Sequence, residues 1–202
     1  MKKTVALIIC ILSLFAVSSC SLFSSKAPLK HYYQIYYQPK KSSAQPINAT
    51  LRIKTFDADK VYKRYNLVYR TSLEEMFYYN THFWGSKPSD MITDLVASHL
   101  SDQHVFSDII MSIDKKPNYV LSGRIRALDE FVEGEKSFAR VSIVFELKDY
   151  KTNEVILVHS FERRQEAAEK KPSAVVRAMG EIIGSEMEVF IAEIYKTFEN
   201  FD

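Results

Sequence analysis

The side chain most capable of covalent chemistry in this sequence is a cysteine thiol near the N-terminus. The 202 residues include 2 cysteines, Cys10 and Cys20, and both fall in or at the end of one apolar segment. No cysteine follows Cys20, so a disulfide framework for the remainder of the chain is excluded. A thiolate is a strong nucleophile, and the thiol of Cys20 is therefore available for a reaction other than disulfide pairing.

The residues that precede Cys20 are typical of a bacterial lipoprotein signal peptide. Lys2 and Lys3 are followed by an apolar segment, Val5–Val17, which suits a signal-peptide core and is too short to span ~30 Å of hydrocarbon. Val17-Ser18-Ser19-Cys20 resembles the lipobox. The resemblance implies cleavage before Cys20, a diacylglyceryl thioether on its sulfur, and acylation of the new amine by palmitate. Several acyl chains anchor a protein stably in a membrane, whereas a single acyl chain gives only marginal binding. The alternative is a plain secretory signal with an incidental cysteine.

The rest of the chain contains no recognisable catalytic or metal-binding motif. Phosphate-loop, dinucleotide-binding, nucleophile-elbow, C-x-x-C and H-E-x-x-H patterns are all missing from the sequence. His99 and His104, with neighbouring aspartates, are the one candidate metal site; the alternative places His99 on the apolar border of a helix and His104 in a loop. Glu74 and Glu75 are adjacent in a predicted strand and face opposite ways. We therefore expect no enzyme activity, no metal and no cofactor besides the covalent lipid on Cys20.

The charge balance argues against a nucleic-acid partner. The full chain has 27 basic and 25 acidic residues, and cleavage before Cys20 removes only Lys2 and Lys3, which leaves 25 of each. A nucleic-acid-binding protein shows a clear basic excess instead. The roughly 180 remaining residues suit a single domain. We predict a signal peptide at 1–19, a lipidated tether at 20–30 and one domain at 31–202.

Hydrophobic periodicity predicts an α+β domain. The chain should form an antiparallel sheet, made of a β-meander plus N-terminal strands, with two amphipathic helices packed on one face. Gly180 and Gly184, in the second helix, are expected to let the sheet approach that helix closely. The predicted strands cover 31–37, 50–56, two segments of 65–84 around a turn at 71–73, 118–134, 136–150 and 154–166, and the predicted helices cover 88–101 and 172–198.

Residues 66–100 resemble the ABC-type transport auxiliary lipoprotein family, which includes the paraquat-inducible (Pqi) intermembrane-transport lipoproteins. The family pattern appears here as Tyr69-Arg70, Tyr78-Tyr79, Trp84, Pro88 and the strand that begins Asn118-Tyr119-Val120-Leu121. Asn118 is a departure, because an acidic residue is expected there.

The resemblance implies a non-enzymatic auxiliary subunit of a lipid transport system. Its members look like outer-membrane lipoproteins that face the periplasm and partner MCE (mammalian cell entry) domain proteins; Ser21, in place of an aspartate, also favours the outer membrane. A phospholipid ligand and a homo-oligomer are further partners to test. The alternatives are an assembly lipoprotein of another envelope machine, for lipopolysaccharide export or flagella, and a lipid-binding carrier.

Four residues are candidate contacts for the protein partner, and all belong to the segment that carries the resemblance. They are Arg70, Tyr78, Tyr79 and Trp84. Aromatic and arginine side chains dominate the energetics of protein interfaces. The alternative is that Trp84 and the tyrosines belong to the core where the sheet meets the helix.

Overall fold

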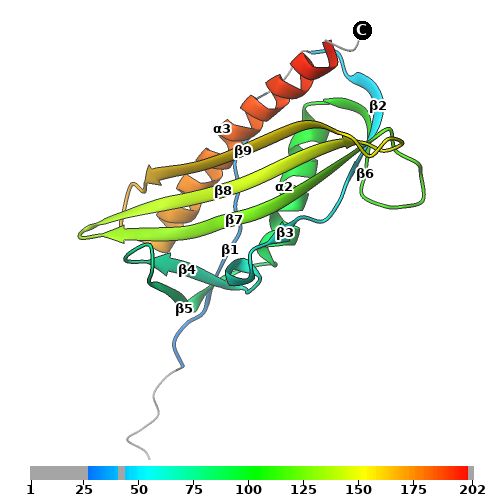
Figure 1. Ribbon diagram of the computed structural model, residues 1–202. Helices are drawn as coiled ribbons and strands as arrows, with labels where there is room; N and C mark the ends of the chain where they lie inside the picture. Colours follow the sequence, from blue (N-terminus) through cyan, green and yellow to red (C-terminus); the bar gives the residue numbers. More distant parts are fainter. Residues whose placement is uncertain (1–26, 41–43, 200–202) are drawn as a thin grey trace, which may run out of the picture.

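The computed structural model describes residues 27–40 and 44–199 (Figure 1). The predicted signal peptide and Cys20 lie outside the described residues. The elements are β1 (His31–Tyr33), β2 (Ile47–Ile53), β3 (Asp57–Ala58), the short 3-10 helix η1 (Lys60–Tyr62), β4 (Asn66–Arg70), β5 (Met76–Trp84), α2 (Pro88–Asp102), β6 (Phe106–Ile110), β7 (Tyr119–Glu133), β8 (Lys136–Asp149), β9 (Val155–Glu166) and α3 (Pro172–Glu199).

The sheet is mixed, and β7 organises it. On one side β7 pairs with β8, and β8 with β9, in the antiparallel meander that the sequence predicts. On its other side β7 pairs in parallel with β2, β3 and β4 along successive parts of its length. The expectation of an antiparallel sheet is therefore correct for the meander and wrong for most N-terminal strands. Parallel pairing needs long crossover connections, and here the segments that contain β5, α2 and β6 provide them.

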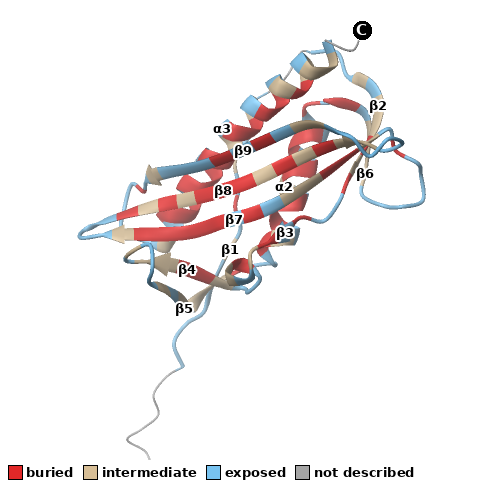
Figure 2. Ribbon diagram, in the orientation of Figure 1, coloured by how far each residue is buried: buried red, intermediate tan, exposed pale blue. Residues whose placement is uncertain are grey.

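The sheet curls into a half-barrel, and α2 and α3 lie against its inner face (Figure 1). Apolar residues at intervals of three and four along α3 are buried there, including Met179, Ile183, Met187 and Phe190, as the sequence pattern predicts. Phe190 stacks on Phe145 of β8 with ring centroids 5.0 Å apart. Figure 2 shows the buried positions concentrated on α2, α3 and the middle strands. No described helix is long and apolar enough to cross a membrane.

The first predicted strand is wrong beyond Tyr33. β1 contains three residues and pairs with β5, and the chain then runs without regular structure between α2 and α3. We call residues 34–39 the strap. Ile35 of the strap is 2% exposed and belongs to the core, so contacts with the two helices replace the sheet hydrogen bonds that its aromatic sequence suggests. The short strands β3 and β6 are not among the strands predicted from the sequence.

Candidate functional site

The four predicted contact residues lie on β4 and β5, but they are not equally accessible. Trp84 is only 2% exposed and is part of the core cluster. Its indole is therefore not on the surface, which favours the alternative in which Trp84 is structural. The Tyr78 hydroxyl donates to the backbone oxygen of Val61, at 3.3 Å. The contact role of the other three residues stays a prediction, and two of them also hold buried carboxylates.

Arg70 belongs to a buried ion cluster around Asp129 of β7, whose side chain is fully buried. Arg70 Nε donates to this carboxylate at 2.9 Å, Arg140 donates twice, at 2.8 and 2.9 Å, and the Tyr62 hydroxyl also donates to it. Burial and then the Asp129 charge raise the pKa of Tyr62 to about 12. The hydrogen bond to Asp129 raises the pKa of Arg140. One carboxylate therefore fixes η1, β4 and β8 against β7.

Tyr79 holds the next carboxylate along β7, on the opposite face. Its hydroxyl donates to Glu130 at 2.6 Å, and the Ser137 hydroxyl donates to the other oxygen of Glu130 at 2.5 Å. Burial and then the hydrogen bond to Glu130 raise the pKa of Tyr79. A partner that uses the Tyr79 hydroxyl would have to compete with this internal bond.

Replacing Trp84 by phenylalanine tests whether the indole is structural. We expect the free energy of unfolding to fall by about 1–3 kcal/mol, because the smaller ring leaves a cavity in a core that cannot fully collapse. Urea unfolding measures the change. Capture of the partner by the folded variant should be unchanged, and a loss of capture without a loss of stability would show that Trp84 contacts the partner.

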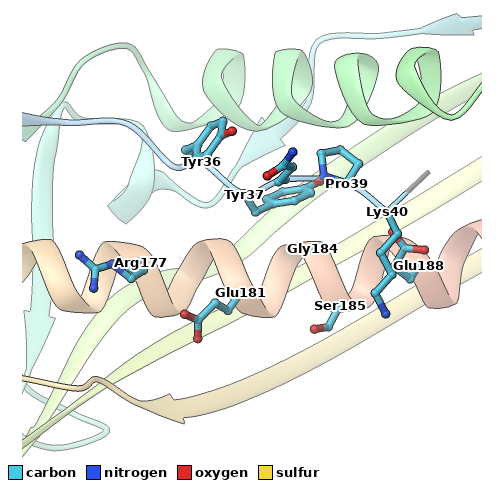
Figure 3. Close-up of a pocket in the computed structure, with 10 residues that line it drawn as sticks. Tyr36, Tyr37, Pro39, Lys40, Arg177, Glu181, Gly184, Ser185 and Glu188 are labelled. Atoms are coloured by element: carbon cyan, nitrogen blue, oxygen red, sulfur yellow. The ribbon is translucent and has the colours of Figure 1, made fainter.

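A groove lies between α2 and α3, and the strap crosses it. Two cavities of about 430 and 410 Å³ lie on either side of the strap. Figure 3 shows the first, with Tyr36, Tyr37 and Lys40 on one wall and Arg177, Glu181 and Glu188 of α3 on the other. The Tyr36 side chain is 74% exposed, so one aromatic ring of the strap is available to a ligand or partner at this groove.

A chain of hydrogen bonds ties the strap to both helices. Gln103 Nε2 is a donor and lies 2.9 Å from a Glu188 oxygen and 2.8 Å from His99 Nε2. A neutral His99 ring must then accept at Nε2 and donate from Nδ1 to the Tyr37 hydroxyl oxygen, 2.7 Å away. Burial lowers the pKa of His99, and Glu188 opposes this effect. His99 is thus a buried structural histidine at the edge of the groove.

The groove is lined by aromatic, polar and charged side chains. Within residues 27–40 and 44–199, no group of three or more His, Cys, Asp or Glu side chains is placed to hold a metal ion. His104 lies in a tight turn after α2, with a backbone φ of 51°. The groove offers aromatic rings and charges of both signs, which suit a protein segment or an amphipathic ligand.

Gly180 and Gly184 make room for the strap, and the expectation that they admit the sheet is wrong. A Cβ on Gly180 would lie 2.6 Å from the backbone oxygen of Tyr36, and a Cβ on Gly184 would lie 3.0 Å from the ring of Tyr37. Glycine at i and i+4 on a helix, together with two tyrosines near the start of the domain, was the one sequence signal of this groove. Nothing in the sequence says which segment approaches the glycines.

Gly180→Ala should loosen the strap. The new methyl group would displace a backbone oxygen, and overpacking costs about 1–3 kcal/mol, which outweighs about 1 kcal/mol gained in helix propensity. We expect lower stability to urea and faster tryptic cleavage after Lys40. Gly85→Ala is the control, because its Cβ would meet the nearest atom at 3.5 Å, an ordinary contact. Unchanged cleavage after Lys40 would contradict the close packing of the strap.

The lowered pKa of His99 predicts how stability depends on pH. In the unfolded chain His99 has a pKa near 6.5 and becomes protonated as the pH falls below that value. In the folded protein His99 stays neutral at the same pH, because its pKa is lowered. Its contribution to stability is therefore present above pH 6.5 and is lost as the pH falls below that value. Urea midpoints at several pH values should show this decline, and His99→Gln should reduce it. An equal slope in both proteins would contradict the assignment.

Comparison with known proteins identifies the family to which this chain belongs. The model of the ABC-type transport auxiliary lipoprotein component matches residues 33–188, from the end of β1 into the second half of α3. The chain belongs to this family. The resemblance in the sequence is thereby confirmed, and the family's role as a transport auxiliary lipoprotein component applies to this chain. No curated protein sequence matches the chain.

Two crystal structures have folds similar to that of this chain. Protein XCC0632 from Xanthomonas campestris is 16% identical, with a TM-score of 0.75 over 84% of this chain and 97% of its own. An uncharacterized protein is 15% identical, with a TM-score of 0.68 over 83% of this chain and 99% of its own. At such low identity these similarities show the fold alone.

Proposed function

We propose that this protein is a non-enzymatic auxiliary subunit of an MCE/ABC-type lipid transport system, anchored in the outer membrane through Cys20. The family match over residues 33–188 is the observation that supports the transport role. The lipobox-like Val17–Cys20 segment supports the anchor. In this role the domain faces the periplasm and docks an MCE-domain protein that carries phospholipid between the membranes.

The path of the chain suits an anchored docking module. The predicted tether leads directly into β1, and the strap that follows is held between α2 and α3 by Tyr37 and the glycines of α3. The segment nearest the predicted anchor is thus in contact with both helices and, through Ile35, with the core. The buried carboxylates of β7 join it to the neighbouring strands through hydrogen bonds, and a preorganised surface lowers the entropy cost of binding a partner.

Affinity capture from native membranes tests the partner. A C-terminally tagged chain should retain an MCE-domain protein and the ABC transporter, identified by mass spectrometry of protein and lipid together. A gene for an MCE protein beside the gene for this chain would agree with that result. Capture of a lipopolysaccharide-export β-barrel or of flagellar components would support the assembly alternative and contradict this proposal.

The cavities beside the strap favour one second candidate, a lipid-binding carrier. The cavity on the α2 side is lined by apolar side chains such as Ile35, Met91 and Leu95 together with polar ones, and such a lining suits part of an acyl chain. A carrier should retain phospholipid in stoichiometric amount when it is purified from membranes, beyond the lipid on Cys20. Repeated absence of such lipid would exclude this candidate.

A further inference from the structure

The corner of the domain nearest the N-terminus has an unusual composition. The segments 27–33, 60–70 and 76–87 contain no aspartate or glutamate and hold six lysine and arginine residues. The rest of the mature chain must carry the compensating acidic excess, because the total is balanced. Pairing of β1 with β5 and of β5 with β4 brings these segments together. We call residues 27–33, 60–70 and 76–87 the N-terminal corner.

Most cations of the N-terminal corner are free to bind an anion. Lys63 pairs with Asp57, and Arg70 is committed to the buried Asp129. Within the described residues, four more cations of the corner have no ion pair: Lys30, Lys60, Arg64 and Lys87. These four cations lie on segments that carry no acidic residue, and the neighbouring Asp57 and Asp59 are already paired with Lys63 and Arg124. This arrangement favours a positive local potential.

Aromatic rings accompany these cations. Lys30 Nζ lies 5.8 Å from the centre of the Phe83 ring, and Arg64 lies 4.8 Å from that of Tyr78. Tyr32 is 66% exposed and contacts Phe83, with ring centroids 5.7 Å apart. Leu29, where the chain leaves the domain, is 76% exposed. Exposed tyrosines beside lysine and arginine are typical of surfaces that lie at the headgroup level of a membrane.

The length of the chain places this corner near the bilayer. Leu29 follows Cys20 by nine positions, and a fully extended chain spans at most ~3.6 Å per residue. If Cys20 carries the lipid, Leu29 lies within about 32 Å of the membrane surface. Figure 1 shows β1, β4 and β5 at one end of the molecule and β2, β6 and the C-terminal end of α3 at the other. The N-terminal corner is therefore the end that can reach the lipid headgroups.

We propose that the N-terminal corner binds the anionic phospholipid surface of the leaflet in which the protein is anchored. This inference rests on the lipid anchor of the proposed function. The free lysine and arginine side chains contact the lipid phosphates, while Leu29 and Tyr32 enter the boundary between headgroups and acyl chains. The domain is then held with a fixed orientation, with β6 and the far end of α3 directed away from the membrane and toward the periplasm.

Two single-cysteine probes on the purified lipidated protein test this orientation. The Cys20 sulfur is acylated and Cys10 is removed with the signal peptide, so Leu29→Cys and Ile113→Cys each introduce one free thiol for an environment-sensitive dye. Ile113 is 83% exposed and lies beyond β6, at the opposite end. On phosphatidylcholine vesicles with added phosphatidylglycerol, the dye at position 29 should shift to the blue and the dye at position 113 should not.

Charge reversal then tests the headgroup contact. Arg64→Glu should reduce the membrane-inserted fraction of the position-29 dye by at least roughly fivefold, since one cation near an anionic surface contributes about this factor, and 0.5 M salt should act in the same direction. Lys151→Glu, in the turn between β8 and β9, is the matched control and should have no effect. Arg64→Gln should give an intermediate value.

The possible outcomes distinguish a failure of the lipid anchor from a failure of the proposed membrane contact at the N-terminal corner. Protein that does not sediment with the vesicles would contradict the lipid anchor itself. Protein that sediments while the dye at position 29 stays in water would overturn only the present inference. An equal blue shift on neutral vesicles, or at position 113, would also overturn it, and a shift that appears only after a periplasmic protein is added would assign the corner to protein docking.

Discussion

Replacing Cys20 by alanine should remove the protein from the outer membrane completely. Without the thiol no diacylglyceryl thioether can form, and signal cleavage at a lipobox depends on that modification. The variant should therefore persist as an inner-membrane precursor or appear as a soluble form. The change is all or none, because without acyl chains the domain keeps only the weak electrostatic contacts of its surface.

Membrane fractionation and intact-protein mass measure this effect. The wild type should fractionate with the outer membrane and carry the mass of a mature chain that begins at Cys20 plus its acyl groups. Cys10→Ala is the matched control and should behave as the wild type, because that cysteine lies within the apolar segment that is cut away. A Cys20→Ala variant that still fractionates with the outer membrane would refute the lipobox assignment.

Removing the charge of Asp129 should have the largest effect on stability within the described chain. Asp129→Asn leaves Arg70 and Arg140, whose side chains are 13% and 17% exposed, without their shared counter-ion. Breaking a buried ion pair on one side costs about 3–5 kcal/mol, since the remaining charge stays buried and uncompensated. Such a loss is a large fraction of the total stability of a typical domain, and the variant should unfold at markedly lower urea concentration.

An exposed ion pair on the same strand provides the control. Asp59 accepts two hydrogen bonds from Arg124, at 2.7 and 2.9 Å, but both side chains are well exposed. Solvent screens this pair, so Asp59→Asn should change stability little. Equal losses in the two variants would mean that the Asp129 cluster behaves like a surface pair. A small loss for Asp129→Asn would show that its arginines find other partners, with Glu162 the nearest to Arg140.

Periodicity in the sequence is sufficient for most of the fold. The three strands of the meander and both helices appear within one or two residues of their predicted ends, because long amphipathic segments carry a strong signal. Pairing direction is a different matter, since nothing in the pattern of an N-terminal strand shows whether the chain returns parallel or antiparallel to it in β7. β3 contains two residues and β6 five, too few for a reliable period.

The candidate site is harder to predict than the fold, and the strap shows why. His31–Tyr37 has a strand-like composition, but its second half packs between two helices that follow it by more than fifty and one hundred residues. The partners of Arg70 and Tyr79 are likewise distant in sequence, so their internal role becomes visible only in three dimensions. Trp84 is a similar case, because its sequence position at the end of a half-buried strand does not reveal that its indole belongs to the core cluster.

Direct binding between the two purified proteins tests the proposed docking of a periplasmic MCE-domain protein on this domain. The lipidated chain in detergent should co-elute with the MCE-domain protein on size-exclusion chromatography as a stoichiometric complex, and the Tyr36→Ala variant would report whether the interhelix groove contributes. The wild type and the MCE-domain protein should be mixed at concentrations at which the complex captured from membranes stays intact. Separate elution of the two proteins would then contradict the proposed docking.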